Sequence, residues 1–157
     1  IPALLDSEGP DGKPIALFES GAILLYLAGK TGRFLPRSVR GRYQMLQWLM
    51  FQMASFGPTL AQARNVGSSA PDQSTCPIDR DTHEARRLVG AIDRELARTG
   101  AFVAGRQYSI ADMAIFPWLR SPANPGIDLD DFPQVRRWLD TLESRPAVRR
   151  AYSVLAK

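Results

Sequence analysis

The sequence predicts an α/β unit of two strands and one helix, followed by an all-helical domain. Two short apolar stretches, residues 1–6 and 15–18, flank a segment rich in turn-forming residues, as expected of a β-hairpin. From residue 20 onwards, apolar residues recur at three- and four-residue spacing, which is the period of a helix with one buried face. We therefore expect a first domain at residues 1–33 and an all-helical domain at residues 38–157.

The composition and charge pattern argue against nucleic acids and membranes as partners. The formal net charge is +4, but acidic residues are interspersed among the basic ones, and no basic run carries aromatic residues placed to stack on bases. No apolar run is long enough to cross a bilayer, and the start lacks the pattern of a signal peptide. We therefore expect neither a nucleic acid nor a membrane as partner.

The pattern of reactive side chains excludes several kinds of site. No metal-ligand spacing, phosphate-binding loop or Ser-His-Asp set is present, so we expect no metal. The single cysteine, Cys76, cannot form an internal disulfide, which is consistent with a cytoplasmic location. Its own role stays open, and His83, the single histidine, is expected at the surface.

Glu19 and Ser20 stand where the strand pattern gives way to a helical one. Ser20 is a favourable residue for the cap of a helix N-terminus. A helix N-terminus offers unpaired N–H groups and a partial positive charge, which suit a carboxylate, and the carboxylate of Glu19 can hold an ammonium. Together they can bind both charges of an α-amino acid; the alternative is that Ser20 only caps the helix.

The remaining pattern is helical. A long helix is expected from about residue 39 to 65, with a kink rather than a stop at Gly57 and Pro58, because the apolar spacing continues beyond them. Ser109 and Asp112 have the spacing of a capping box ahead of a buried apolar helix. Further helices are expected at about 78–98, 132–142 and 146–155. The apolar stripe of the long helix is Tyr43, Leu46, Leu49, Met50, Met53 and Phe56.

Several segments together resemble one known family. They are Ile1-Pro2-Ala3-Leu4-Leu5-Asp6, Leu17-Phe18-Glu19-Ser20-Gly21-Ala22, Tyr108-Ser109-Ile110-Ala111-Asp112 and Ser144-Arg145-Pro146-Ala147. They resemble the glutathione transferase superfamily, closest to the bacterial Nu class with its disulfide-bond oxidoreductases and to the fungal nitrogen-regulator prion branch. The resemblance implies a glutathione transferase fold, in which the first unit is a thioredoxin-like remnant. The family's first strand, first helix and second strand would precede Ile1, so we expect the sequence to be a fragment.

The resemblance also implies a glutathione site. Ile1 would pair its backbone with the cysteinyl part of glutathione, ahead of a cis bond to Pro2. Glu19 and Ser20 would hold the γ-glutamyl group. Arg80 matches an arginine that contacts glutathione in the family, and the alternative is a solvated arginine paired with a neighbouring aspartate. The residue that contacts the sulfur is expected in the segment before Ile1, so no catalytic residue is named within the chain.

A second substrate would lie between the first unit and the long helix, with Gln52, Met53 and Phe56 as candidate wall residues. The alternative for each is a core or dimer contact. Tyr26 and Tyr43 are expected to pack in the core. After Pro58 the sequence departs from its Nu-class relatives, because it has Arg64-Asn65-Val66 where they carry a His-His-Phe run.

The resemblance implies a homodimeric glutathione transferase, which binds glutathione and transfers its thiol to an electrophile or uses it to reduce a disulfide. One alternative is a non-catalytic glutathione-binding module with a regulatory or interaction role. Another is a structural domain like those attached to translation factors, which would bind no glutathione.

Overall fold

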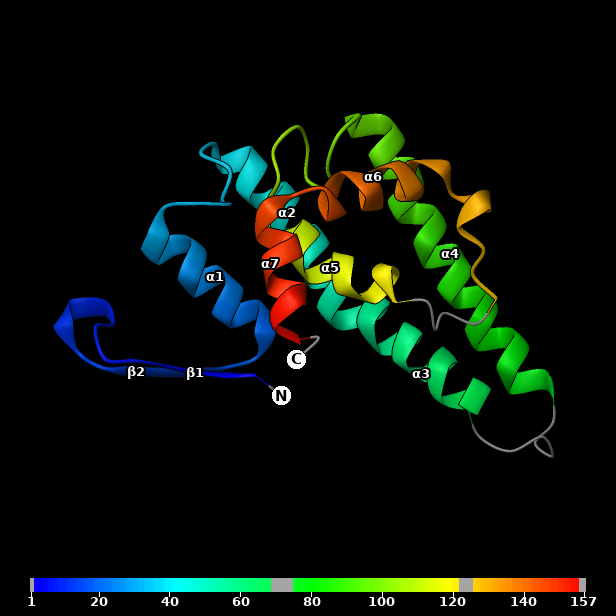
Figure 1. Ribbon diagram of the computed structural model, residues 1–157, viewed down its shortest axis with the longest axis horizontal. Helices are drawn as coiled ribbons and strands as arrows, with labels where there is room; N and C mark the ends of the chain where they lie inside the picture. The colour runs from blue at the N-terminus through cyan, green and yellow to red at the C-terminus, as the bar shows by residue number, and fades with distance from the viewer. Residues whose placement is uncertain (1, 69–74, 122–125, 156–157) are drawn as a thin grey trace.

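A β-hairpin and one helix lie at one end of the molecule, and the other helices form the body (Figure 1). The computed structural model describes residues 2–68, 75–121 and 126–155, with the side chains of 65–68, 75–81 and 155 excepted. Along these residues, none of the helices combines the length and the apolar character needed to cross a bilayer. In the same part of the chain, no three His, Cys, Asp or Glu side chains come together as they would around a metal ion.

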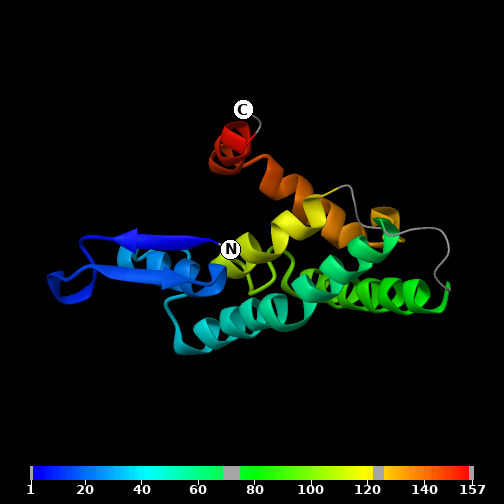
Figure 2. The ribbon, with the colours of Figure 1, turned by 90° about the horizontal axis from the view of Figure 1, so that it is seen from below.

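The predicted hairpin is confirmed. Strand β1 (Ala3–Asp6) pairs antiparallel with β2 (Ile15–Phe18), with Ala3 opposite Phe18 and Asp6 opposite Ile15. A 3₁₀ turn, η1 (Pro10–Gly12), joins the strands, and its residues Asp11 and Gly12 have positive φ angles, as turn-forming residues allow. Figure 2 shows the hairpin lying flat beside the first helix, α1 (Ser20–Thr31).

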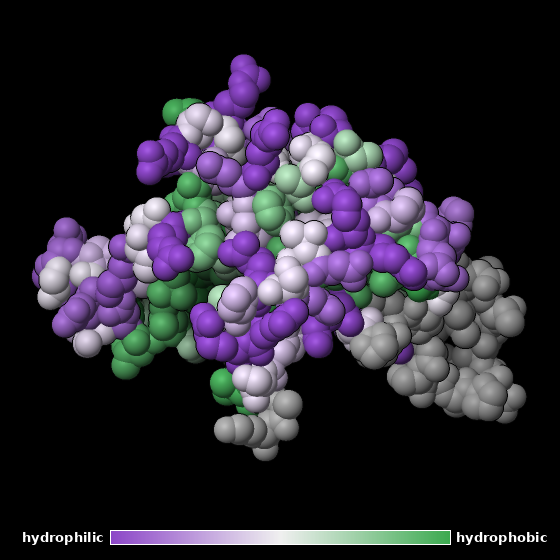
Figure 3. Space-filling view, turned by 45° about the horizontal axis from the view of Figure 1, so that its top comes forward, coloured by the Kyte–Doolittle hydropathy of each residue, from purple (hydrophilic) through white to green (hydrophobic). Residues whose placement is uncertain are grey.

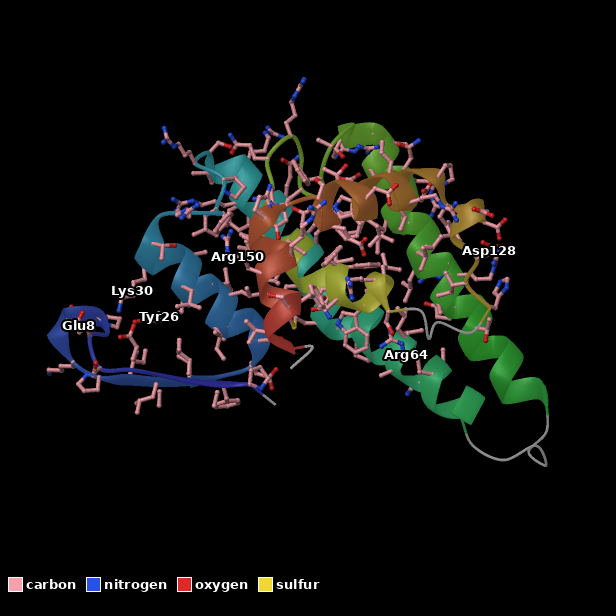
Figure 4. All side chains as sticks on the ribbon, in the orientation of Figure 1. Glu8, Tyr26, Lys30, Arg64, Asp128 and Arg150 are labelled. Carbon is pink, nitrogen blue, oxygen red and sulfur yellow. The ribbon has the colours of Figure 1, made fainter. Side chains whose placement is uncertain are left out.

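Polar side chains tie the hairpin to α1. The Tyr26 hydroxyl donates a hydrogen bond to Asp6 Oδ2 at 2.7 Å, and Lys30 Nζ forms a salt bridge with the same oxygen. Lys30 Nζ also donates to the backbone carbonyl of Glu8 at 2.8 Å, and Figure 4 shows Tyr26 and Lys30 pointing from α1 toward the turn that carries Glu8. The expectation that Tyr26 packs in the core was wrong, because its half-buried hydroxyl bonds to Asp6 instead.

These contacts make the hairpin's stability depend on pH. The hydrogen bonds from Lys30 and then Tyr26 lower the pKa of Asp6 from 3.8 to about 2. A carboxylate with a lowered pKa in the folded state stabilises it fully above the unfolded value and loses this effect as pH falls through about 2. We expect Asp6→Asn to lower the melting temperature at neutral pH, and the gap from wild type to close as pH falls from about 4 to 2.

Melting curves of both proteins across this pH range test the expectation. Glu8→Gln is the matched control, because the hydrogen bond from Lys30 goes to the backbone carbonyl of Glu8, which this substitution keeps. A gap between wild type and Asp6→Asn that is equally large at neutral pH and at the acid end would contradict the assignment.

The long helix runs through Pro58, as predicted. Helix α2 (Val39–Phe51), a π-helical turn η2 (Gln52–Phe56) and α3 (Gly57–Ser68) follow one another without a break. The N–H of Gly57 donates to the carbonyl of Gln52, a bond across five residues that widens the helix just ahead of the proline. Pro58 therefore falls in the first turn of α3, where a missing N–H is tolerated.

The predicted apolar stripe of this helix is only partly right. Leu49 and Phe56 are fully buried, but Tyr43 is 69% exposed and Met50 49% exposed, so the expected core position of Tyr43 was wrong. Met45 and Trp48 fill the core in their place. The face that is buried is the one on which α5 (Ile110–Arg120) packs.

Helix α5 is the centre of the body, since it contacts α1, α2, α3 and α6 (Pro133–Glu143). The long helix α4 (Thr75–Thr99) packs against α3 and α6, and α7 (Pro146–Leu155) packs against α6. A short 3₁₀ turn, η3 (Leu129–Asp131), precedes α6. The predicted helices are confirmed, each within a few residues of its expected ends.

The capping box at the start of α5 is confirmed, and Asp112 does more than cap. Its carboxylate, which is 0% exposed, accepts hydrogen bonds from the backbone N–H and hydroxyl of Ser109, the N–H of Val103 and the indole N–H of Trp138, at 3.0–3.1 Å. Burial raises the pKa of Asp112, and these hydrogen bonds act against that rise. Asp112 thus joins α5, the loop before it and α6 in the core.

Candidate functional site

The turn between β2 and α1 places Glu19 in an unusual backbone conformation, with φ 70° and ψ 119°. Residues other than glycine seldom adopt positive φ, and such strain is concentrated at ligand sites. The expectation that Ser20 caps the helix was wrong. Glu19 is the N-cap, since the N–H of Ile23 donates to its carbonyl at 3.0 Å, and Ser20 is the first helical residue.

This geometry leaves three kinds of polar group together at one spot. The side chains of Glu19 and Ser20 are both exposed, and the N–H groups of residues 20–22 precede the first hydrogen bond within the helix. Figures 1 and 2 place this end of α1 beside the helical body. A carboxylate, a hydroxyl and a helix N-terminus in this arrangement suit a ligand that carries an ammonium and a carboxylate on one carbon.

The first turn of α1 packs directly on the π-helical turn. The Ser20 hydroxyl donates to Met53 Sδ at 3.8 Å. A Cβ added to Gly21 would lie 3.0 Å from Met53 Cε, so glycine permits the close approach. Met53 therefore contacts both residues that follow Glu19 and links the start of α1 to the long helix.

A cavity of about 330 Å³ opens where α1, the π-helical turn and α5 meet. Its wall is mostly apolar, with Ser20 and Gln52 as polar residues. The residues that line it are Pro2, Ser20, Ile23, Leu24, Gln52, Met113, Ala114, Pro117 and Trp118.

The structure thus brings together Pro2, Ser20 and Gln52 of the predicted site residues, with Glu19 adjacent to Ser20. Ile1 lies outside the described residues, and with it the predicted cis bond to Pro2. Arg80 belongs to α4, but its side chain also lies outside the described part of the chain.

The other two pocket candidates lie elsewhere. Phe56 is fully buried and stacks on Phe51 in the core, so we remove it from the proposed pocket. Met53 is half-buried and contacts Ser20 rather than the cavity wall. His83 is exposed on α4, as expected of a surface residue.

The wall contributed by α5 was missed. Met113, Ala114, Pro117 and Trp118 share one face of that helix, which their three- and four-residue spacing in the sequence would have indicated. Arg64, at the position where the Nu-class relatives have a histidine, supports this wall. Its guanidinium donates to the Trp118 carbonyl at 2.6 Å and lies 5.3 Å from the centre of the ring, and burial lowers the pKa of Arg64.

Comparison with known proteins assigns the helical part of the chain to a family. Residues 63–146 match the family model of the glutathione S-transferase C-terminal domain. The disulfide-bond oxidoreductase YfcG of Escherichia coli is 41% identical over 152 residues, which cover 96% of this chain and 70% of YfcG.

Two solved structures extend the likeness to the whole fold. A glutathione transferase from Burkholderia graminis, with two glutathione molecules bound per subunit, is 45% identical, has a TM-score of 0.89 and matches 96% of this chain and 65% of its own. A glutathione transferase from Pseudomonas putida, with one glutathione disulfide bound per subunit, is 45% identical, with a TM-score of 0.87 and coverages of 96% and 67%. The chain therefore spans about two thirds of the length of these proteins.

Proposed function

Because the chain belongs to the glutathione S-transferase family, we propose that it binds glutathione and uses its thiol to reduce a disulfide or to attack an electrophile. The observation that carries this proposal is the position of Glu19 and Ser20 at the N-terminal end of α1, beside a cavity that reaches α5. The glutathione or glutathione disulfide bound in the similar structures supports it.

We place the γ-glutamyl end of glutathione on this turn. The Glu19 carboxylate accepts hydrogen bonds from the ammonium, and the Ser20 hydroxyl and the first N–H groups of α1 donate to the α-carboxylate. The backbone at Ile1 and Pro2 binds the cysteinyl part, and Arg80 makes a further contact. No residue of the chain is proposed as the group that contacts the sulfur.

Disulfide reduction is the preferred reaction, because YfcG is a disulfide-bond oxidoreductase and the Pseudomonas structure holds glutathione disulfide. The thiolate of glutathione attacks one sulfur of the substrate, forms a mixed disulfide and releases the other sulfur as a thiolate. A second glutathione thiolate then attacks the mixed disulfide, which releases the remaining substrate thiolate and leaves glutathione disulfide. With an electrophile such as an aryl chloride, the thiolate instead forms one bond from sulfur to carbon, the bond from that carbon to chlorine breaks, and chloride leaves.

An assay of the complete protein with glutathione and bis(2-hydroxyethyl) disulfide tests the proposal, with glutathione reductase and NADPH reporting the glutathione disulfide formed. We expect reduction well above the uncatalysed rate, and a weaker reaction with 1-chloro-2,4-dinitrobenzene. Glutathione binding without either reaction would favour the non-catalytic regulatory module. A protein that binds no glutathione would overturn the proposal.

We also propose that the protein is a homodimer. Val39, Tyr43 and Met50 on α2 are 71%, 69% and 49% exposed, and an uncovered apolar face of this kind is typical of an interface. Sedimentation of the complete protein tests this, and a monomer at all concentrations would contradict it. We keep the division into domains at 1–33 and 38–157 and the cytoplasmic location as proposals, the latter because the reaction needs reduced glutathione.

A further inference from the structure

One buried polar group in the cavity wall is not used by the proposed binding of glutathione. The Gln52 side chain is 4% exposed and lines the cavity beside Trp118. Among the residues that the structure describes, none donates a hydrogen bond to Gln52 Oε1. Buried carboxamide oxygens nearly always have a donor, so this oxygen is a feature that calls for a ligand.

The backbone holds Gln52 in this position. It begins the π-helical turn, and its carbonyl accepts the wide-turn hydrogen bond from the N–H of Gly57. A Cβ on Gly57 would lie 2.8 Å from Gln52 Nε2, so the absence of a side chain at Gly57 leaves room for the carboxamide. Single π-helical turns of this kind occur frequently at functional sites.

The neighbouring contacts place this group next to the proposed glutathione site. Met53, the following residue, contacts the Ser20 hydroxyl and lies against Gly21. The cavity therefore has Ser20 on the side of α1 and Gln52 on the side of the long helix, with apolar side chains of α5 between them. Figure 3 shows how apolar side chains gather where the hairpin unit meets the helical body.

We propose that Gln52 is a specificity-determining residue for the second substrate, whose O–H or N–H group donates a hydrogen bond to Gln52 Oε1. This inference rests on the proposed function. A disulfide that carries such a donor gives the buried oxygen a partner, whereas a purely apolar disulfide leaves it unpaired. The cleft thus selects disulfides with a donor near the sulfur over apolar ones of the same shape.

Two disulfides of equal size test the inference with the complete protein and saturating glutathione. Bis(2-hydroxyethyl) disulfide and dipropyl disulfide differ only in having a hydroxyl or a methyl group at each end. We expect wild type to prefer the hydroxylated substrate by about 10-fold in kcat/KM, after correction for the uncatalysed rates. Gln52→Met should lower this ratio to about 1 by lowering kcat/KM for the hydroxylated substrate. Gln52→Glu, which keeps an acceptor oxygen, should retain a preference for that substrate.

Binding of S-methylglutathione, which has no free thiol, distinguishes a failure of the proposed function from a failure of the role given to Gln52. We expect wild type and Gln52→Met to bind it equally. If wild type does not bind it, the proposed function fails. If binding is intact but wild type shows no preference between the two disulfides, or Gln52→Met keeps the wild-type ratio, only the role of Gln52 is overturned. A wild-type ratio near 1 overturns the role of Gln52 even where a variant does not fold.

Discussion

Replacing Glu19 with glutamine is expected to weaken glutathione binding by about 10-fold or more, because an ionised acceptor forms hydrogen bonds roughly twice as strong as a neutral one. The substitution keeps the size and shape of the side chain and removes the charge that we propose binds the ammonium. Glutamine is also no worse suited than glutamate to the positive φ at this position. Calorimetric titration with glutathione measures the change.

Glu8→Gln is the control for net charge, since Glu8 is an exposed acid on the same hairpin unit. We expect it to bind glutathione like wild type. Because the Glu19 side chain is exposed, salt should weaken binding by wild type more than binding by Glu19→Gln. Glutathione affinity that is equal in wild type, Glu19→Gln and Glu19→Ala would remove Glu19 from the site.

Replacing Asp112 with alanine should have the largest effect on stability, about 3–5 kcal/mol in the free energy of unfolding. The substitution leaves the buried N–H groups of Val103, Ser109 and Trp138 without the acceptor that they share. Each buried donor that is left unpaired is costly. Urea denaturation measures the loss.

Asp140→Ala is the matched control, since Asp140 is an exposed residue of α6, and we expect a change within about 0.5 kcal/mol. Trp138→Phe removes one donor from Asp112 and keeps a buried ring. Its loss in free energy of unfolding should therefore lie between those of Asp140→Ala and Asp112→Ala. A loss below about 1 kcal/mol for Asp112→Ala would contradict the role given to this carboxylate.

The elements that could be predicted from the sequence are those fixed by local chemistry. Turn-forming residues between two apolar stretches specify the hairpin, and Ser109 with Asp112 specifies the start of α5. The cap of α1 was placed one residue late, because Glu19, which has a positive φ, follows the strand directly and its carbonyl accepts the first helical bond.

The features that could not be predicted depend on packing between distant segments. The spacing of apolar residues in α2 does not say which of them α5 covers, so Tyr43 was placed in the core while it lies at the surface. The π-helical turn adds one residue to a helical turn, which rotates the following residues by about 100° relative to a regular helix. A pattern with a period of 3.6 residues cannot indicate this rotation, nor the unpaired oxygen of Gln52 at its start.

The position of glutathione in a crystal structure of the complete protein tests the central claim most directly. We predict that the ammonium of the γ-glutamyl group lies within hydrogen-bond distance of the Glu19 carboxylate, and that its α-carboxylate meets the Ser20 hydroxyl and the first N–H groups of α1. Glutathione bound at another place, with Glu19 and Ser20 making no contact to it, would contradict the account.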